Sequence, residues 1–214
     1  MQINEIFCSI NGESAKAGLR TVFIRTFGCN CFCSYCDTLY AVKGDDFKEM
    51  SIDEIMEEVN SFCCKRVTCT GGEPLLQHDM LDLVKRLIDE NYEVEIETNG
   101  AVDIWPYVEL DPEKVLITMD WKCPSSGMNH RMLQDNLGYL RYTDVIKFVV
   151  GTQEDLEEVN RVSGLTLAET YISPVFGMIE PKELAEYIIK NQLNDTRLQL
   201  QQHKVIWESN MRGV

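Results

Sequence analysis

Short apolar runs rich in β-branched residues alternate with amphipathic stretches along most of the chain, and this alternation constrains the fold more than any other feature. Helices between consecutive strands imply right-handed crossovers and a mainly parallel sheet. Six runs have the character of strands: 21–26, 66–70, 92–98, 115–119, 145–150 and 170–175. The chain has 214 residues, whereas an eight-stranded barrel typically takes about 250. We therefore predict an α/β fold, an open or partial parallel β/α barrel of about six strands, in one domain spanning residues 1–214.

Helix-start signals divide these strands. Ser51 with Glu54 and Thr152 with Asp155 have the spacing of capping boxes, in which two side chains satisfy free amides at a helix start. The predicted helices cover about 52–60, 80–90, 156–162 and 181–191. Sheets of this kind bind ligands at the carboxyl ends of their strands, so we expect functional residues in the loops that follow the strands.

Charge and cysteine content limit the function. Lys and Arg number 20 against 35 Asp and Glu, which gives a formal net charge of -15. Attraction to nucleic acid or to an anionic membrane is therefore not expected. We find no leader-like start and no long apolar run, so a cytoplasmic location is expected. Nine cysteines in a reducing compartment favour metal or redox chemistry at some of them.

Three cysteines follow the first predicted strand at short intervals. Cys29, Cys33 and Cys36 have the spacing C-x3-C-x2-C, so one loop can wrap three thiolates around an inorganic cluster. Three ligands leave one iron of a [4Fe-4S] cubane open for chemistry. The alternatives are a chance group of buried thiols or a zinc site completed by another cysteine or by a histidine such as His78 or His203.

Cys31 lies inside this spacing and offers an alternative ligand set, but we expect it to point away and pack. Five other thiols are scattered through strand-like or helix-flanking sequence, where free cysteine commonly serves as a small buried hydrophobe. Structural roles are predicted for all five: Cys8, Cys63, Cys64, Cys69 and Cys123.

A second motif, Gly71-Gly72-Glu73-Pro74, ends the second predicted strand. The glycines allow a close approach of the backbone to a ligand, and Glu73 offers an acceptor for an ammonium group. With the three cysteines, this motif resembles the signature of radical S-adenosylmethionine (SAM) enzymes. The resemblance implies a truncated radical SAM core in which the open iron chelates SAM and an electron from the cluster generates a 5′-deoxyadenosyl radical.

Further stretches narrow the resemblance to the 7-carboxy-7-deazaguanine synthase family. They are 5–13, 23–29, Cys36-Asp37-Thr38, 97–100, 120–127, 173–177 and 199–207, so the resemblance spans nearly the whole chain. It implies a lyase that converts 6-carboxy-5,6,7,8-tetrahydropterin into 7-carboxy-7-deazaguanine with loss of ammonia, in queuosine or other 7-deazapurine biosynthesis.

The same resemblance assigns residues to ligands. Arg25 would pair with the pterin carboxylate, for which a guanidinium has matching geometry, and Thr38 would coordinate Mg²⁺. The remaining substrate contacts would be Ile10, Asn11, Gly12, Thr70, His203 and Val214. The SAM contacts would be Gly72, Glu73, Lys122, Ser173, Pro174, Val175 and Phe176. Asn11 stands where the family usually has Gln, and Ser14 where it has Gly.

The expected partners are the small pterin substrate, a reducing electron donor such as flavodoxin or ferredoxin, and a second copy of the chain in a homodimer. Two other functions remain open at this point. One is another small radical SAM enzyme such as a glycyl-radical activase, and the other is a non-catalytic iron-sulfur electron carrier or a zinc-stabilised binding module.

Overall fold

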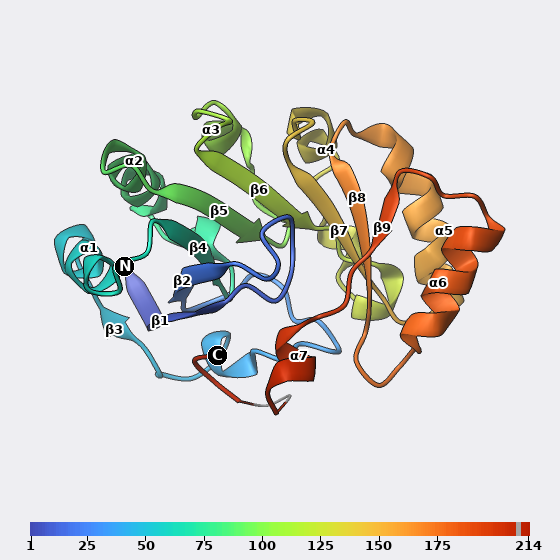
Figure 1. The fold of residues 1–214 in the computed structure, drawn as a ribbon, viewed down its shortest axis with the longest axis horizontal. Helices are drawn as coiled ribbons and strands as arrows, with labels where there is room; N and C mark the ends of the chain where they lie inside the picture. Colours follow the sequence, from blue (N-terminus) through green and yellow to red (C-terminus); the bar gives the residue numbers. More distant parts are fainter. Residues whose placement is uncertain (209–210) are drawn as a thin grey trace.

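The computed structural model describes residues 1–208 and 211–214, and its organising element is one curved sheet (Figure 1). The strand order is β3-β1-β2-β4-β5-β6-β7-β8-β9. The strands are β1 (Gln2–Ile10), β2 (Arg20–Thr26), β3 (Lys48–Glu49), β4 (Arg66–Gly71), β5 (Glu93–Thr98), β6 (Val115–Asp120), β7 (Val145–Val150), β8 (Glu169–Pro174) and β9 (Thr196–Leu198).

The predicted parallel strands are confirmed. β2, β4, β5, β6, β7 and β8 are neighbours in this order and pair in parallel. β7 has the predicted bounds, and the other strand ends differ from the prediction by at most one residue. Buried Val, Ile and Met on the central strands, such as Ile96, Ile117 and Met119, account for this accuracy because they lack the alternation of a half-exposed strand.

The predicted number of about six strands is too low, since the described residues form nine. β1 pairs antiparallel with β2, β3 pairs with β1, and β9 extends the parallel edge beyond β8. A search for strands separated by helices misses β1, because residues 11–19 return directly to β2 without a helix. β3 and β9 are only two and three residues long, too short for a periodic signal.

The helices lie around the outside of the curved sheet, except for α7 (His203–Ile206), which lies on the inner side near the end of the chain (Figure 1). The outer helices are α1 (Ile52–Ser61), α2 (Met80–Asp89), α3 (Trp105–Val108), α4 (Asp135–Tyr139), α5 (Gln153–Val162) and α6 (Pro181–Lys190). Both predicted capping boxes are present, at Ser51 and at Thr152. None of the described helices is long and apolar enough to cross a membrane.

The apolar core fills the space between the sheet and the outer helices. α2 buries Leu83 and Leu87, α1 buries Ile55, and these residues share one cluster with Ile96 and Ile117 of the sheet. Burial of side chains of this size stabilises the fold by about 1.5–3 kcal/mol each. The helices are therefore anchored on one side of the strands, and the loops after the strands are left to form a site.

Candidate active site

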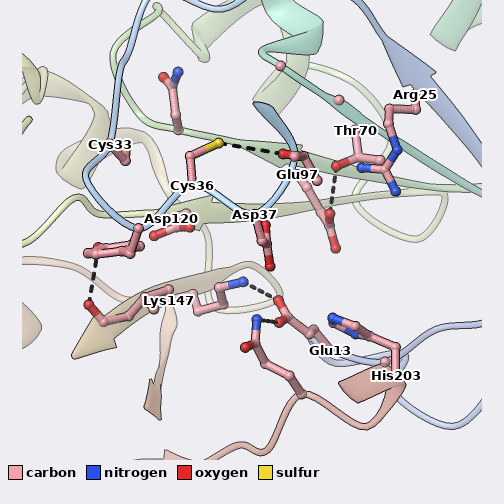
Figure 2. Close-up of a pocket in the computed structure, with 18 of the residues that line it drawn as sticks. Glu13, Arg25, Cys33, Cys36, Asp37, Thr70, Glu97, Asp120, Lys147 and His203 are labelled. Carbon is pink, nitrogen blue, oxygen red and sulfur yellow. Dashed lines mark hydrogen bonds and ion pairs between the residues drawn. The ribbon is translucent and has the colours of Figure 1, made fainter. Parts of the chain in front are cut away.

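A cavity of about 610 Å³ opens at the carboxyl ends of the parallel strands (Figure 2). Residues at or just after five strands line it: Thr70 (β4), Thr98 (β5), Asp120 (β6), Val149 (β7) and Val175 (β8). Residues from β1 and from the last part of the chain complete the wall. The cavity is therefore where a parallel sheet is expected to place its ligands.

Most of the predicted site residues line this cavity. They are Ile10, Asn11, Gly12, Arg25, Cys29, Cys33, Cys36, Thr38, Thr70, Gly72, Lys122, Val175, Phe176, His203 and Val214. Three predicted SAM contacts do not line it: Glu73, Ser173 and Pro174. The loops that carry the predicted residues thus meet at one cavity, but three of the side chains assigned from the resemblance do not face it.

The three-cysteine loop forms one wall of the cavity. The Sγ atom of Cys29 accepts hydrogen bonds from the backbone N–H of Cys31 (3.4 Å) and from Nδ2 of Asn99 (3.5 Å). The Cys36 Sγ atom lies 3.7 Å from the hydroxyl oxygen of Thr38. N–H donors directed at sulfur stabilise thiolates and tune iron-sulfur clusters.

These thiols fit a cluster better than a single metal ion. Within residues 1–208 and 211–214, no three His, Cys, Asp or Glu side chains converge so that they could hold one ion. A cubane presents a different iron to each cysteine, so its ligands need not meet at one point. Burial raises the pKa of Cys33 to about 11, so binding here as thiolate requires positive charge of the kind that cluster iron provides.

Most of the other cysteines are buried or half-buried, as predicted, but Cys31 and Cys63 differ from the prediction. Cys31 is buried, and burial raises its pKa to about 12, but it lines the cavity together with Cys29, Cys33 and Cys36 rather than pointing away from it. Cys64, Cys69 and Cys123 are also buried. Cys63 is exposed, and its φ of 52° is in the left-handed region, so the predicted packing role is wrong for this residue. The reversal after α1 places it at a turn rather than in the core.

Glu73 stabilises the loops around the site and does not line the cavity. Its buried carboxylate accepts hydrogen bonds from the backbone N–H groups of Leu75 (3.1 Å) and Asn99 (2.7 Å) and from the Thr98 hydroxyl (2.8 Å). Burial raises its pKa to about 7 despite these donors. The side chain therefore ties the turn after β4 to the end of β5.

Gly72 allows the turn after β4 to touch the cysteine loop. A Cβ at Gly72 would collide with the backbone carbonyl group of Gly28, and Glu73 N–H donates to that carbonyl oxygen at 2.8 Å. Gly28 itself has a φ of 92°, which favours glycine. The glycines bring two loops into direct contact beside the cysteines.

Lys122 and Asp120 form an ion pair on the same side of the cavity, with 2.7 Å between Nζ and Oδ2. Burial disfavours the ammonium form, but Asp120 and the Cys33 thiol outweigh that effect and raise the pKa of Lys122. The second oxygen of Asp120, Oδ1, is buried without a hydrogen-bond partner in the described chain. It is an acceptor available to a bound ligand.

Arg25 faces the cavity from β2. Its Nε atom donates to Glu5 Oε1 at 2.7 Å, and its guanidinium lies 5.6 Å from the ring centre of Phe7. Its terminal Nη atoms have no hydrogen-bond partner among residues 1–208 and 211–214. A fixed guanidinium with free terminal nitrogens can bind a carboxylate through two hydrogen bonds.

Another part of the cavity wall carries a buried ion pair that was not predicted from the sequence. Lys147 of β7 pairs with Glu13, which also accepts from Gln201, and His203 lies beside them (Figure 2). Burial alone raises the pKa of Glu13, but Lys147 and its other partners lower it to about 2. Both members therefore stay charged at neutral pH.

Two carboxylates, those of Glu95 and Glu97, lie on β5. Glu97 lines the cavity and accepts a hydrogen bond from Thr70 at 2.8 Å, and burial together with the charge of Glu95 raises its pKa to about 7. Glu95 accepts hydrogen bonds from Asn11 (2.9 Å), Ser14 and Thr118 (2.7 Å). Ser14 adopts a φ of 62°, so this loop keeps a glycine-like backbone although the residue is Ser.

The end of the chain closes the remaining side. His203 packs so closely over Gly12 that a Cβ there would collide with its ring, and Gln202 N–H donates to the Gly12 carbonyl oxygen at 3.0 Å. Burial lowers the pKa of His203, which favours the neutral imidazole. Lys204 forms an ion pair with Asp37 in the cysteine loop, with 2.7 Å between Nζ and Oδ2.

Six charged cavity residues were not predicted from the sequence: Glu13, Asp37, Glu97, Asp120, Lys147 and Lys204. Asp120 ends β6 and Glu97 is the second-last residue of β5, so their position at a carboxyl end was an available signal. Lys147 was available as the one charge within the otherwise apolar β7. Glu13 needed knowledge of its partner, which lies 134 residues later.

Comparison with known proteins gives consistent matches. The model of the radical SAM superfamily matches residues 23–116. A 7-carboxy-7-deazaguanine synthase of Clostridium acetobutylicum is 42% identical, with 100% of this chain and 99% of the relative covered. The enzyme of the same name from Methanospirillum hungatei is 43% identical, with 96% and 85% covered.

Solved structures agree at the level of the fold. The crystal structure of QueE from Escherichia coli has a TM-score of 0.77, with 94% of this chain and 93% of that chain covered at 22% identity. SuiB from Streptococcus suis, bound to S-adenosylmethionine, has a TM-score of 0.59 and 14% identity, with 81% of this chain and 48% of that chain covered. The partial radical SAM barrel predicted from the sequence is therefore confirmed.

Proposed function

The chain belongs to the 7-carboxy-7-deazaguanine synthase family of radical SAM enzymes, and from this premise we propose that it converts 6-carboxy-5,6,7,8-tetrahydropterin into 7-carboxy-7-deazaguanine with loss of ammonia. One observation carries the proposal. A single cavity has cluster-forming thiols on one wall and a guanidinium with free terminal nitrogens on another. That arrangement suits a small carboxylated substrate placed beside a source of radicals.

Cys29, Cys33 and Cys36 would hold the [4Fe-4S] cluster, with Asn99 donating to the first sulfur. When bound, the cluster and SAM would supply one-electron reduction and hydrogen-atom abstraction at C6 of the pterin. Gly72, Lys122, Val175 and Phe176 lie where they can contact SAM. The free Oδ1 atom of Asp120 could accept a hydrogen bond from the ammonium or ribose groups of SAM.

The pterin would lie across the cavity from the cysteines. Arg25 would bind its carboxylate, and Thr38 would contribute a hydroxyl ligand to a Mg²⁺ ion that shares the carboxylate and water. Glu97 and Glu13 are acceptors for the N–H groups of the pterin ring, and Lys147 holds Glu13 ionised. These side chains would orient the ring so that C6 faces the cluster side.

The cavity lining separates residues proposed to contact the pterin from one that supports the substrate loop. Ile10, Gly12, Thr70, His203 and Val214 are within the cavity and are proposed to contact the pterin. Asn11 lines it too, but its amide nitrogen already donates to Glu95. We therefore assign Asn11 to the support of the substrate loop rather than to a contact made through its amide nitrogen.

The wider setting is proposed from the family and from charge. A flavodoxin or ferredoxin would reduce the cluster, and the enzyme would act as a cytoplasmic homodimer in queuosine or other 7-deazapurine synthesis. Binding to nucleic acid or membranes is not expected at a net charge of -15. One sheet contains all nine described strands, which supports one domain spanning 1–214.

Anaerobic reconstitution followed by incubation with SAM, a reductant and the carboxytetrahydropterin tests the function. We expect about four irons per chain and release of ammonia with the deazaguanine product, without equivalent accumulation of 5′-deoxyadenosine. An electron carrier would bind iron without cleaving SAM. A glycyl-radical activase would cleave SAM but leave the pterin unchanged, and either result would reject the proposal.

Substrate binding can be separated from cluster assembly. Arg25→Lys keeps the charge but loses the planar pair of donors, so the pterin KM should rise by at least about tenfold. The iron content and SAM cleavage without pterin should stay at wild-type levels. An unchanged KM in this variant would remove Arg25 from the substrate site.

A further inference from the structure

Arg212 is clamped against the cysteine-loop side of the cavity by three independent contacts. Its guanidinium carbon lies 3.9 Å from the ring centre of Tyr40. Its Nη1 atom donates to Asp46 Oδ2 at 2.9 Å, and its Nη2 atom donates to Asn4 Oδ1 at 3.2 Å. Asn4 and Asp46 are 208 and 166 residues away in the sequence, so these contacts fold the end of the chain back onto its beginning.

Tyr40 links this clamp to Arg25. The Arg25 guanidinium carbon lies 5.9 Å from the Tyr40 ring centre, so the ring contacts both guanidinium groups. The Tyr40 hydroxyl donates to Glu5 Oε1 at 3.4 Å, and Arg25 Nε donates to the same oxygen at 2.7 Å. Tyr40 and Glu5 therefore connect Arg212 to the side chain proposed to bind the substrate carboxylate.

The clamp also fixes part of the cavity wall. Val214, two residues beyond Arg212, lines the cavity, whereas Arg212 itself does not. Tyr40 belongs to the short helical turn Leu39–Ala41, which follows Thr38 directly. Movement of Arg212 would therefore affect both the end of the chain and the turn that follows the proposed magnesium ligand.

We propose that Arg212 is a positioning residue for substrate binding, which acts by stacking on Tyr40 to hold Arg25 and the last residues of the chain at the cavity. This role rests on the proposed function. Arg212 touches no substrate, so its loss should weaken pterin binding rather than remove the chemistry. A cation over an aromatic ring is a modest interaction, which sets the expected size of the effect at about tenfold.

The chain offers a matched control in Arg197. Its guanidinium carbon lies 5.5 Å from the Tyr171 ring centre, and Nη2 is 2.9 Å from Glu169 Oε1, but none of its atoms lines the cavity. Arg197→Ala therefore removes the same kinds of contact at a remote edge of the sheet. Tyr40→Phe keeps the ring and loses only the hydroxyl, whereas Tyr40→Leu removes the stack.

The test measures steady-state kinetics of the reconstituted holoenzyme and amide hydrogen exchange over residues 38–43. Arg212→Ala and Tyr40→Leu should raise the pterin KM by about tenfold with little change in kcat or in SAM cleavage without pterin, and should speed exchange in this segment. Arg197→Ala should resemble wild type in both measurements, and Tyr40→Phe, which keeps the ring stack, should raise the KM less than Tyr40→Leu.

The outcomes separate this proposal from the proposed function. A KM for Arg212→Ala equal to that of Arg197→Ala would overturn the positioning role, even if exchange became faster. A wild-type enzyme that binds SAM but neither binds nor converts the pterin would instead reject the proposed function. In that case, faster exchange in Arg212→Ala would show that the clamp exists but has no role in this reaction. This result would also overturn the positioning role.

Discussion

Lys147 of β7 and Glu13 of the loop after β1 form a buried ion pair across the cavity. The pair joins the antiparallel β1–β2 edge of the sheet to the middle of its parallel region, 134 residues further along the chain. Both side chains are largely buried, with 10% and 11% of their surface exposed, so each charge depends on the other for stabilisation.

Loss of one member should therefore cost more than loss of both. Lys147→Met leaves the Glu13 carboxylate buried without its cation, and the free energy of unfolding should fall by about 3–5 kcal/mol. Adding Glu13→Gln should recover most of this loss. Urea unfolding of the three proteins measures the difference. Lys182→Met is the control, because Lys182 pairs with Glu186 at the surface and should contribute less than about 1 kcal/mol.

The cysteine loop predicts a sharp distinction between neighbouring thiols. Cys33→Ala removes a proposed cluster ligand, whereas Cys31→Ala removes a buried thiol two residues away. Iron and sulfide content and SAM cleavage should collapse in the first variant and persist in the second. Equal loss of iron in both would assign Cys31 to the cluster as well.

Glu97 predicts a pH dependence of substrate binding. Its pKa of about 7, raised by burial and by Glu95, means that it gains a proton as pH falls from 8 to 6 and then accepts hydrogen bonds poorly. The pterin KM of the wild type should rise over this interval, and this component should be absent in Glu97→Gln. An identical pH profile in both proteins would remove Glu97 from the substrate site.

The raised pKa of Glu97 also predicts how the free energy of unfolding changes with pH. The folded state holds the proton more tightly than the unfolded chain, so the contribution of Glu97 is full below about pH 4.5 and is lost as pH rises through about 7. Glu97→Gln should flatten this decline in the free energy of unfolding. Glu93→Gln, at a more exposed position on the same strand, should leave it unchanged.

Gly72 predicts a steric effect at the contact between two loops. Gly72→Ala places a methyl group against the Gly28 carbonyl group and should lower both the melting temperature and cluster incorporation. Gly138→Ala is the matched control, because a Cβ there meets open space and its φ lies outside the left-handed region. Alanine favours the helix α4 relative to glycine, so the control should be neutral or slightly more stable.

Local patterns predicted the elements whose signals lie within a few residues. The Ser51 and Thr152 capping boxes and the β7 bounds depend on short-range geometry and burial, and the structure confirms them. β1 was missed because a hairpin without a helix does not fit the alternating pattern. The three cysteines of the C-x3-C-x2-C spacing line one cavity because all three belong to one loop.

Residue roles that depend on distant partners could not be predicted in this way. Glu73 has the residue type of a ligand group, but donors from β5 hold its carboxylate inside the fold. Asn11 is similar, since its amide nitrogen is directed to Glu95, 84 residues away. Sequence neighbours carry no information about such pairings, which appear only when the strands are assembled.

Residues 203–208 and 211–214 lie on the inner side of the sheet, and they have a consequence for the order in which the site is completed. A nascent chain that has emerged only to residue 198 already contains the cysteine loop and every parallel strand, but it lacks His203, Lys204 and Val214 from the wall of the cavity. The side of the cavity where Lys204 pairs with the cysteine loop is therefore the last to be completed.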